Sequence, residues 1–174
     1  ASGEKCDNAN PPPPWGEGVE DSLCYRSIVL HHPFQFFQKY RDALDIFFLT
    51  KEDNIQTDAD IAARIGTTNI ASLWQVHGNR VIAVRKPTER KEKADGLITD
   101  ERNLLLTMRA ADCQLILVYA PEYRVVGLLH VGWRGLLEKT IHAFFKKLHG
   151  EWSIQPQETL VGIGPSLRQC CAEY

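Results

Sequence analysis

The stretch Arg124–Gly135, RVVGLLHVGWRG, contains the change from strand to helix around which we expect the fold to be organised. The apolar and β-branched run Arg124–Val131 is typical of a buried strand. A glycine-bounded turn follows, and the apolar spacing of Gly135–His149 predicts an amphipathic helix that Gly150 closes. The face of this helix that we expect to be buried consists of Leu136, Leu137, Thr140, Ile141, Phe144, Phe145 and Leu148.

Short strands are expected along the rest of the chain, with helices at intervals. Helices are predicted over Phe34–Leu44 and after Thr57, which has the chemistry of a helix N-cap, with Gly66 ending the second helix. Such a mixture indicates the α+β class, as a single domain of mixed β-sheets packed with helices. The further strands are predicted at Tyr25–Leu30, Ile46–Leu49, Ile70–Val76, Val81–Val84, Ala94–Thr99, Leu104–Met108, Gln114–Tyr119 and Leu160–Ile163.

The composition is that of a soluble globular protein with one domain. The chain has 174 residues, of which 44% are hydrophobic and 24% charged, and its formal net charge is −2. A nucleic-acid partner or an anionic membrane requires a basic face, and neither is expected. Residues 1–20, rich in proline, asparagine and glycine, predict a flexible tail. The odd number of cysteines, five, does not indicate a disulfide framework, so we expect reduced thiols and a cytoplasmic protein.

Three potential ligands for a soft metal ion lie at expected strand ends: His77 before a turn, Cys113 at the start of an apolar strand and His130 at the end of another. At strand ends a rigid sheet can direct side chains towards a shared site. Two imidazoles and a thiolate suit zinc or copper, and zinc with three protein ligands keeps a fourth position for water or substrate. The spacing alone also fits a core thiol and two loop histidines.

Motifs around these residues follow one another in a fixed order, and the set resembles the laccase-domain family. That family is also called the multicopper polyphenol oxidase family, and its members are described as purine nucleoside phosphorylases with adenosine deaminase activity. The resemblance covers roughly residues 70–173. The motifs are Gln75-Val76-His77-Gly78, Ala94-Asp95-Gly96-Leu97-Ile98-Thr99, Ala111-Asp112-Cys113, His130-Val131-Gly132-Trp133-Arg134-Gly135, Gly162-Ile163-Gly164-Pro165 and Cys170-Cys171.

The resemblance implies one metal-binding domain over residues 21–174, with His77, Cys113 and His130 as ligands of zinc or, alternatively, copper. The activity it implies is phosphorolysis of adenosine, inosine and methylthioadenosine, with hydrolytic deamination of adenosine. The implied partners are therefore a purine nucleoside and phosphate, and no oligomeric state is predicted. Family members continue beyond the last matched block, so we expect the domain to be incomplete at its C-terminus.

Residues beside the motifs are candidates for substrate chemistry. Asp112 is a candidate catalytic acid/base for deamination at C6, or else a carboxylate that satisfies backbone donors. Arg134, expected in a glycine-flanked turn before the helix, is a candidate for catalysis and phosphate binding, or else forms a salt bridge; Arg109 is a second phosphate candidate. Trp133 is a candidate to stack on a purine, or else packs in the core. Asp95 is a candidate to orient a ligand, or else forms an Asp-Gly turn, which the sequence favours.

Three other functions remain open. One is a copper-dependent polyphenol oxidase, although several copper centres require more histidines than the six in this chain. Another needs no metal: Cys113 is then a catalytic nucleophile that His130 activates, as in a thiol hydrolase. The last is a binding protein with a degraded site.

Overall fold

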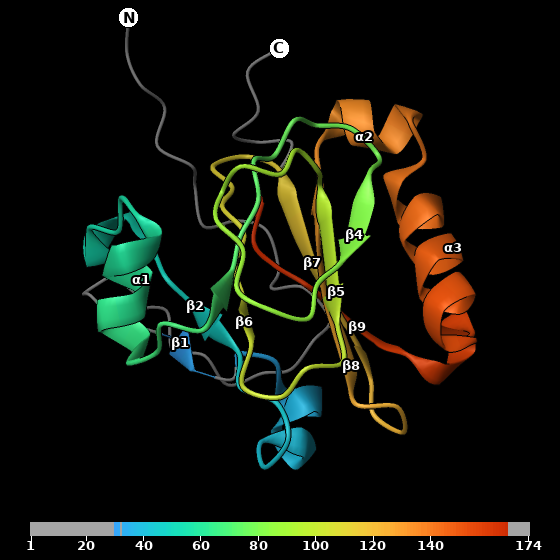
Figure 1. Cartoon of the computed structure of the whole chain (residues 1–174), viewed down its shortest axis with the longest axis horizontal. Helices are drawn as coiled ribbons and strands as arrows, with labels where there is room; N and C mark the ends of the chain where they lie inside the picture. The colour runs from blue at the N-terminus through green and yellow to red at the C-terminus, as the bar shows by residue number, and fades with distance from the viewer. Residues whose placement is uncertain (1–29, 32, 167–174) are drawn as a thin grey trace, which may run out of the picture.

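The computed structural model describes residues 30–31 and 33–166, and a five-stranded sheet forms its centre (Figure 1). The strand order is β4-β5-β8-β7-β9. The β4–β5 pair is parallel, whereas the other three pairs are antiparallel. The sheet is therefore mixed, as the sequence predicts. Its strands are β4 (Val81–Ala83), β5 (Gly96–Thr99), β7 (Gln114–Ala120), β8 (Val125–Val131) and β9 (Leu160–Ile163).

Smaller elements complete the chain, and the predicted α+β class is confirmed. Two further pairs of short strands are present, one antiparallel and one parallel: β1 (Leu30–His31) with β2 (Phe47–Phe48), and β3 (Ile70–Ala71) with β6 (Leu105–Leu106). The helices are α1 (Asp58–Ile65), α2 (Trp133–Leu137) and α3 (Thr140–Trp152), with 3-10 turns η1 (Gln35–Tyr40), η2 (Lys51–Asp53) and η3 (Pro156–Glu158).

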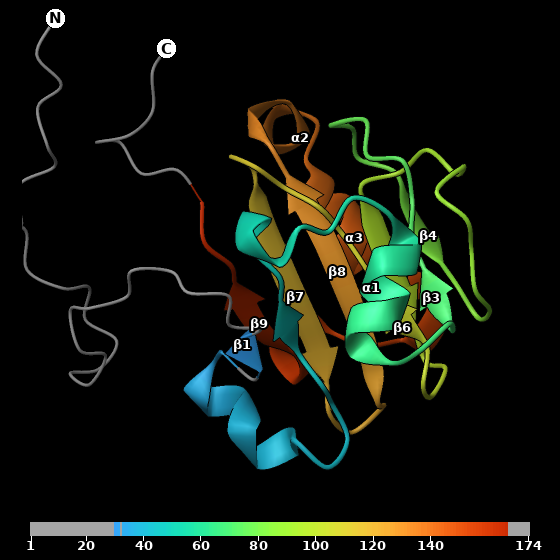
Figure 2. The same ribbon diagram turned by 90° about the vertical axis from the view of Figure 1, so that its left-hand side faces the viewer.

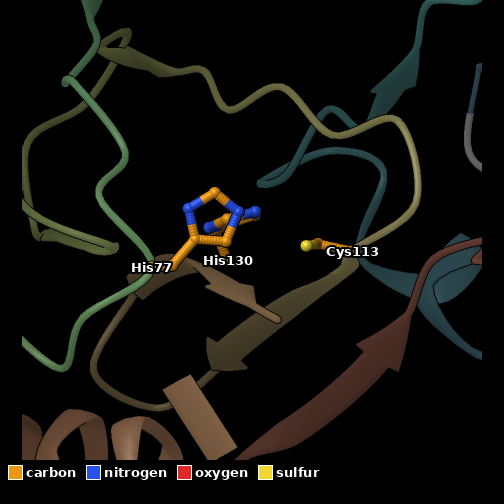
Figure 3. Close-up of side chains that lie close together, drawn as sticks. All are labelled: His77, Cys113 and His130. Atoms are coloured by element: carbon orange, nitrogen blue, oxygen red, sulfur yellow. The ribbon is translucent and has the colours of Figure 1, made fainter. Parts of the chain in front are cut away.

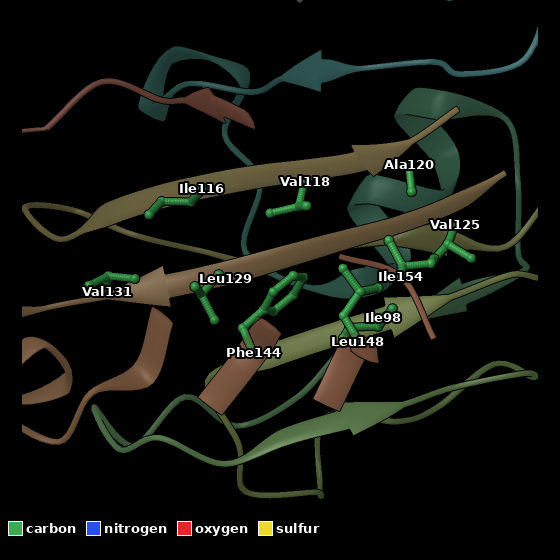
Figure 4. Packing of buried hydrophobic residues seen from close by; sticks show 10 residues of the cluster. All are labelled: Ile98, Ile116, Val118, Ala120, Val125, Leu129, Val131, Phe144, Leu148 and Ile154. Atoms are coloured by element: carbon green, nitrogen blue, oxygen red, sulfur yellow. The ribbon is translucent and has the colours of Figure 1, made fainter. Parts of the chain in front are cut away.

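The sheet lies between α3 on one side and the shorter elements on the other, as Figures 1 and 2 show. Side chains alternate between the two faces of a strand. On β8, Val125, Leu129 and Val131 pack in the cluster that contains Phe144 of α3 (Figure 4). Leu128 contacts the clusters on the opposite face. His130 is two residues after Leu128 on the same strand, so its side chain lies on the same face as that of Leu128. This is the face that α3 does not cover.

The prediction of a single helix over Gly135–His149 is wrong, because the structure has two helices, α2 and α3, in this region. Lys139 has a left-handed backbone with φ 61°, which separates α2 from α3 and gives them different axes. Consequently Leu136 and Leu137 are 58% and 74% exposed, against the prediction that they are buried. The α3 residues Thr140, Phe144 and Leu148, spaced by four, form its buried face, whereas Ile141 is 38% exposed. The helix ends at Trp152 with a left-handed Ser153, and not at Gly150.

Other predicted elements are confirmed with changed limits. Thr57 caps α1 through a reciprocal pair of hydrogen bonds with Asp60, and Gly66 ends the helix with φ 83°. The helix expected over Phe34–Leu44 is the short 3-10 turn η1. The strand expected over Ile70–Val76 is limited to β3 and to an isolated bridge of Trp74 with Lys93, so residues 75–80 form a loop.

Several predictions fall outside the described residues: the tail over residues 1–20, most of the strand over Tyr25–Leu30, and the pair Cys170-Cys171. No helix in the described part of the chain is long and apolar enough to span a bilayer.

We predict that Gly127→Ala destabilises the fold. A Cβ at this position of β8 lies 2.8 Å from Cε2 of Phe144 and 3.0 Å from the carbonyl oxygen of Leu97, and Phe144 is fully buried. Overpacking of this kind costs about 1–3 kcal/mol. Chemical denaturation measures the loss in the free energy of unfolding.

Gly150→Ala in α3 is the matched control, because a Cβ there meets no atom within 4 Å. Alanine has the higher helix propensity, so this variant is expected to gain about 0.5–1 kcal/mol. Equal stability changes in the two variants would contradict the packing described for β8 against α3.

Candidate metal centre

The three predicted ligands lie together (Figure 3). One nitrogen from each histidine and the sulfur of Cys113 all lie within 4.8 Å of one another. His77 belongs to the loop before β4, Cys113 immediately precedes β7, and His130 is in β8. The His77 and His130 rings are 4.8 Å apart at their centroids and inclined at 75°. Side chains that are 36 and 17 residues apart along the chain are thus brought to one point.

Backbone pairing positions two of the ligands. Leu115 of β7 is opposite His130 of β8 in the antiparallel ladder. Continuing this register places Cys113 opposite Gly132, and alternation puts Cys113 on the same face as His130. A Cβ at Gly132 would lie 2.9 Å from the sulfur of Cys113 and 3.1 Å from Cδ2 of His77. The missing side chain of Gly132 therefore leaves the space in which the ligands meet.

Asp95, which the sequence offers as a candidate to orient a ligand, contacts His130 and the loop of His77. We expected an Asp-Gly turn, but the residue is fully buried at the start of β5. Its Oδ1 lies 2.8 Å from Nδ1 of His130, and its two oxygens accept the backbone N–H groups of Val76, His77 and Gly78. The backbone N–H of His130 donates to the carbonyl oxygen of Asp95. No spacing rule reveals this contact, because it depends on the pairing of β5 with β8.

The donor set fits a single soft or borderline metal ion. Zn–N bonds of about 2.0–2.1 Å and Zn–S bonds of about 2.3 Å place tetrahedral donors roughly 3.3–3.7 Å apart. The observed limit of 4.8 Å exceeds this spacing, so binding of an ion requires the three donor atoms to move closer together. Burial raises the pKa of the Cys113 thiol, and the nearby carboxylates of Asp112 and Asp95 raise it further. A cation at this place compensates those carboxylates and stabilises the thiolate.

The candidate substrate residues Trp133 and Arg134 follow Gly132 directly. Both are exposed, Trp133 by 64%, so the packing alternative for Trp133 does not hold. The Arg134 guanidinium stacks over the Trp133 ring at 5.1 Å. We expected Arg134 in a turn before a helix, but it lies inside α2.

The other two candidates are placed differently. Asp112 is exposed and close enough to influence the Cys113 thiol. Arg109 is engaged elsewhere, because its guanidinium donates to the Asp58 carboxylate at 3.1 Å and to the carbonyl oxygen of Gln56 at 2.5 Å. Both contacts are at the start of α1, so Arg109 ties α1 to the segment before Cys113.

The fold and the donor set define an α+β domain with a three-ligand site for a metal ion. A family model described as multi-copper polyphenol oxidoreductase laccase matches residues 50–174, and the chain belongs to that family.

Relatives of this chain are named purine nucleoside phosphorylases. One from Rickettsia conorii is 26% identical over 125 residues, which is 72% of this chain and 51% of the relative. YlmD from Geobacillus stearothermophilus is 36% identical over 107 residues, 56% of this chain and 39% of the relative. Among the relatives with the strongest matches, this chain spans between 51% and 64% of their length.

Solved structures have the same fold. The crystal structure of YlmD from Geobacillus stearothermophilus matches with a TM-score of 0.59 and 29% identity, over 64% of this chain and 46% of that one. A hypothetical protein YfiH from Bacillus licheniformis matches with a TM-score of 0.59 and 27% identity, over the same shares of the two chains.

We predict that Gly132→Ala weakens metal binding about tenfold or more, because the new methyl group occupies the space between Cys113 and His77. The backbone of Gly132, with φ −88° and ψ 175°, suits alanine, so the fold itself is not strained. Zinc titration against a competing chelator measures the affinity. Gly150→Ala, remote from the three ligands, serves as the control. Unchanged zinc affinity in Gly132→Ala would show that the ion does not bind where the three side chains converge.

Proposed function

We propose that this chain forms the metal centre of a zinc-dependent purine nucleoside phosphorylase with adenosine deaminase activity. The observation on which the proposal rests is the convergence of His77, Cys113 and His130 within 4.8 Å. Membership of the laccase family and relatives named purine nucleoside phosphorylases support the reaction class. Two imidazoles and a thiolate favour zinc, with copper as the alternative ion.

The proposed main reaction is phosphorolysis of a purine nucleoside such as adenosine, inosine or methylthioadenosine. An oxygen of inorganic phosphate forms a bond to C1′ of the sugar, while the bond from C1′ to N9 of the base breaks. The base leaves with the electron pair and takes up a proton, so that adenosine and phosphate give adenine and ribose 1-phosphate. The leaving base and the incoming anion therefore both need stabilisation at the site.

Three exposed residues beside the ligands are suited to stabilising the phosphate anion and the leaving base. Arg134 presents a planar guanidinium that can hold phosphate with paired hydrogen bonds. Trp133, whose ring centroid lies 5.1 Å from the guanidinium carbon, offers an aromatic surface to a purine. Asp112 adjoins Cys113 and can exchange a proton with the substrate. Arg109 remains a weaker candidate for phosphate, since Asp58 already engages its guanidinium.

The proposed second activity is hydrolytic deamination, in which water replaces the amino group at C6 of adenosine and gives inosine and ammonia. A zinc ion held by His77, Cys113 and His130 would supply a Lewis acid for this step. Asp112 is the proposed group that moves the proton to the departing amine. This assignment needs a carboxylate next to the metal ligands that is not already used in a salt bridge; no ion pair of Asp112 is observed in the described structure.

The alternatives fit the geometry less well. A polyphenol oxidase of the multi-copper type needs several copper centres, whereas residues 30–31 and 33–166 hold one group of three or more potential ligands. A metal-free thiol hydrolase needs a reactive thiolate, but burial and two carboxylates raise the pKa of Cys113. Without a metal, the thiol therefore stays protonated at neutral pH, which opposes nucleophilic catalysis.

The test is product analysis with adenosine and phosphate, on wild type and Cys113→Ala. Zinc-loaded wild type is expected to release adenine and ribose 1-phosphate, with inosine from deamination and hypoxanthine from phosphorolysis of that inosine. A chelator removes the activity and zinc restores it. Cys113→Ala loses most of its bound zinc, measured by elemental analysis, and at least about 100-fold in rate, because two ligands hold the ion much more weakly than three.

Two results would count against the proposal. Intact adenosine after long incubation of zinc-loaded protein would favour a binding protein with a degraded site. Activity that survives chelation but is lost on alkylation of Cys113 would favour the thiol hydrolase. Replacement of the nucleoside by a phenol, with copper as the ion, tests the oxidase.

We predict that Arg134→Ala raises KM for phosphate about 10- to 100-fold, the loss expected for a hydrogen bond to a charged group. Zinc content is expected to stay unchanged, since Arg134 is not a ligand. Lys146→Ala, on the exposed side of α3, is the control and leaves both quantities unchanged. An unaltered KM for phosphate in Arg134→Ala would show that Arg134 does not bind phosphate.

A further inference from the structure

Every lone pair of the Asp95 carboxylate is in use. Oδ1 accepts from the backbone N–H of His77 at 2.9 Å and faces Nδ1 of His130 at 2.8 Å. Oδ2 accepts from the backbone N–H groups of Val76 at 3.2 Å and Gly78 at 2.8 Å. A carboxylate offers about four acceptor positions, and here four donors fill them while the residue is fully buried.

The saturation of Asp95 fixes which nitrogen of His130 carries a proton. The carboxylate can only accept, so Nδ1 of His130 must be the donor. In a neutral imidazole the other nitrogen, Nε2, is then without a proton and has its lone pair free. The side chain of His130 is 4% exposed, which prevents it from rotating to another arrangement. His130 is thus oriented as a ligand by a hydrogen bond that is present without any metal.

The same carboxylate fixes the loop that presents His77. Three consecutive N–H groups, of Val76, His77 and Gly78, converge on Asp95, and such convergence forms an anion-binding nest. His77 has φ 62°, a left-handed conformation that is unfavourable for a residue with a Cβ. The hydroxyl of Thr140 adds one contact, donating to the carbonyl oxygen of Gly78 at 2.8 Å. No strand pairing holds residues 76–78, so Asp95 is their main anchor.

We infer that Asp95 is a positioning residue that sets two of the three ligands, His77 and His130, in place before the ion binds. Asp95 does not itself bind the ion. Cys113 is the remaining ligand, and no side-chain hydrogen bond to its sulfur is present among the described residues. The inference rests on the proposed metal site but not on the proposed reaction. It assigns to one buried carboxylate the preorganisation on which the affinity of the site depends.

The experiment compares zinc affinity in wild type and Asp95→Asn. Asparagine has the same shape, but its amide group brings N–H donors towards the N–H groups of the loop. Zinc affinity is expected to fall about 10- to 100-fold, the usual loss when the partner of a ligand is removed. Asp53→Asn is the matched control, because the Asp53 side chain is also fully buried but lies in η2 and accepts from the backbone N–H of Thr50.

A double-mutant cycle separates positioning from general loss of stability. If Asp95 acts through His130, then Asp95→Asn lowers zinc affinity less in a His130→Ala background than in wild type. A general structural effect would lower the affinity equally in both backgrounds, and that result would overturn the inference.

Two measurements on metal-free wild type keep the test valid if Asp95→Asn fails to fold. Nitrogen NMR is expected to show the proton of His130 on Nδ1, and amide exchange of Val76, His77 and Gly78 is expected to be slow, although His77 is exposed. A proton on Nε2, or fast exchange at these amides, would overturn the inference. If wild type binds no zinc, both the inference about Asp95 and the proposed function are overturned. If it binds zinc but forms no product, only the proposed reaction is contradicted.

Discussion

Burial of one negative charge is the constraint on which this structure depends. A carboxylate removed from water is costly unless donors replace its hydration. Asp95 is fully buried and obtains four donors, three of them from a loop that has no strand partner there and one from His130. The loop therefore needs Asp95 for its conformation, and Asp95 needs the loop for its charge. This mutual requirement gives the segment around His77 one geometry despite the exposure of His77 to solvent.

The sheet explains why these residues meet at one place. Strand β8 is antiparallel to both β5 and β7, so the end of β8 lies beside the starts of its two neighbours. Asp95 precedes β5, Cys113 precedes β7, and His130 is near the end of β8. All three project from the face opposite α3, because side chains alternate along each strand. Gly132 follows at the position where any side chain would contact Cys113 and His77.

Much of this arrangement could be predicted from the sequence, because it depends on local patterns. The apolar runs predict β7 and β8, the chemistry of Thr57 and Gly66 predicts α1, and strand-end positions indicate the three ligands. What could not be predicted depends on contacts between distant segments. The break at Lys139 replaces one helix by two, since a lysine in a left-handed conformation has no sequence signature. Orientation of a ligand by Asp95 was the less favoured of two predictions, because an Asp-Gly pair indicates a turn locally, whereas the environment of Asp95 comes from the β5–β8 register.

The proposed metal site and the proposed substrate site have different structural bases in this chain. The groups that define the metal centre, from His77 to Thr140, lie within the segment that matches the family, and Asp95 and Thr140 are buried. The groups proposed for substrate binding, Trp133 and Arg134, are exposed, and the Arg134 guanidinium lies over the Trp133 ring. Because buried, mutually satisfied groups preserve their geometry, the ion site is determined by this chain's own packing. The orientation of an exposed arginine or tryptophan is set instead by what it contacts, and the proposed nucleoside and phosphate are partners whose chemistry suits these two side chains.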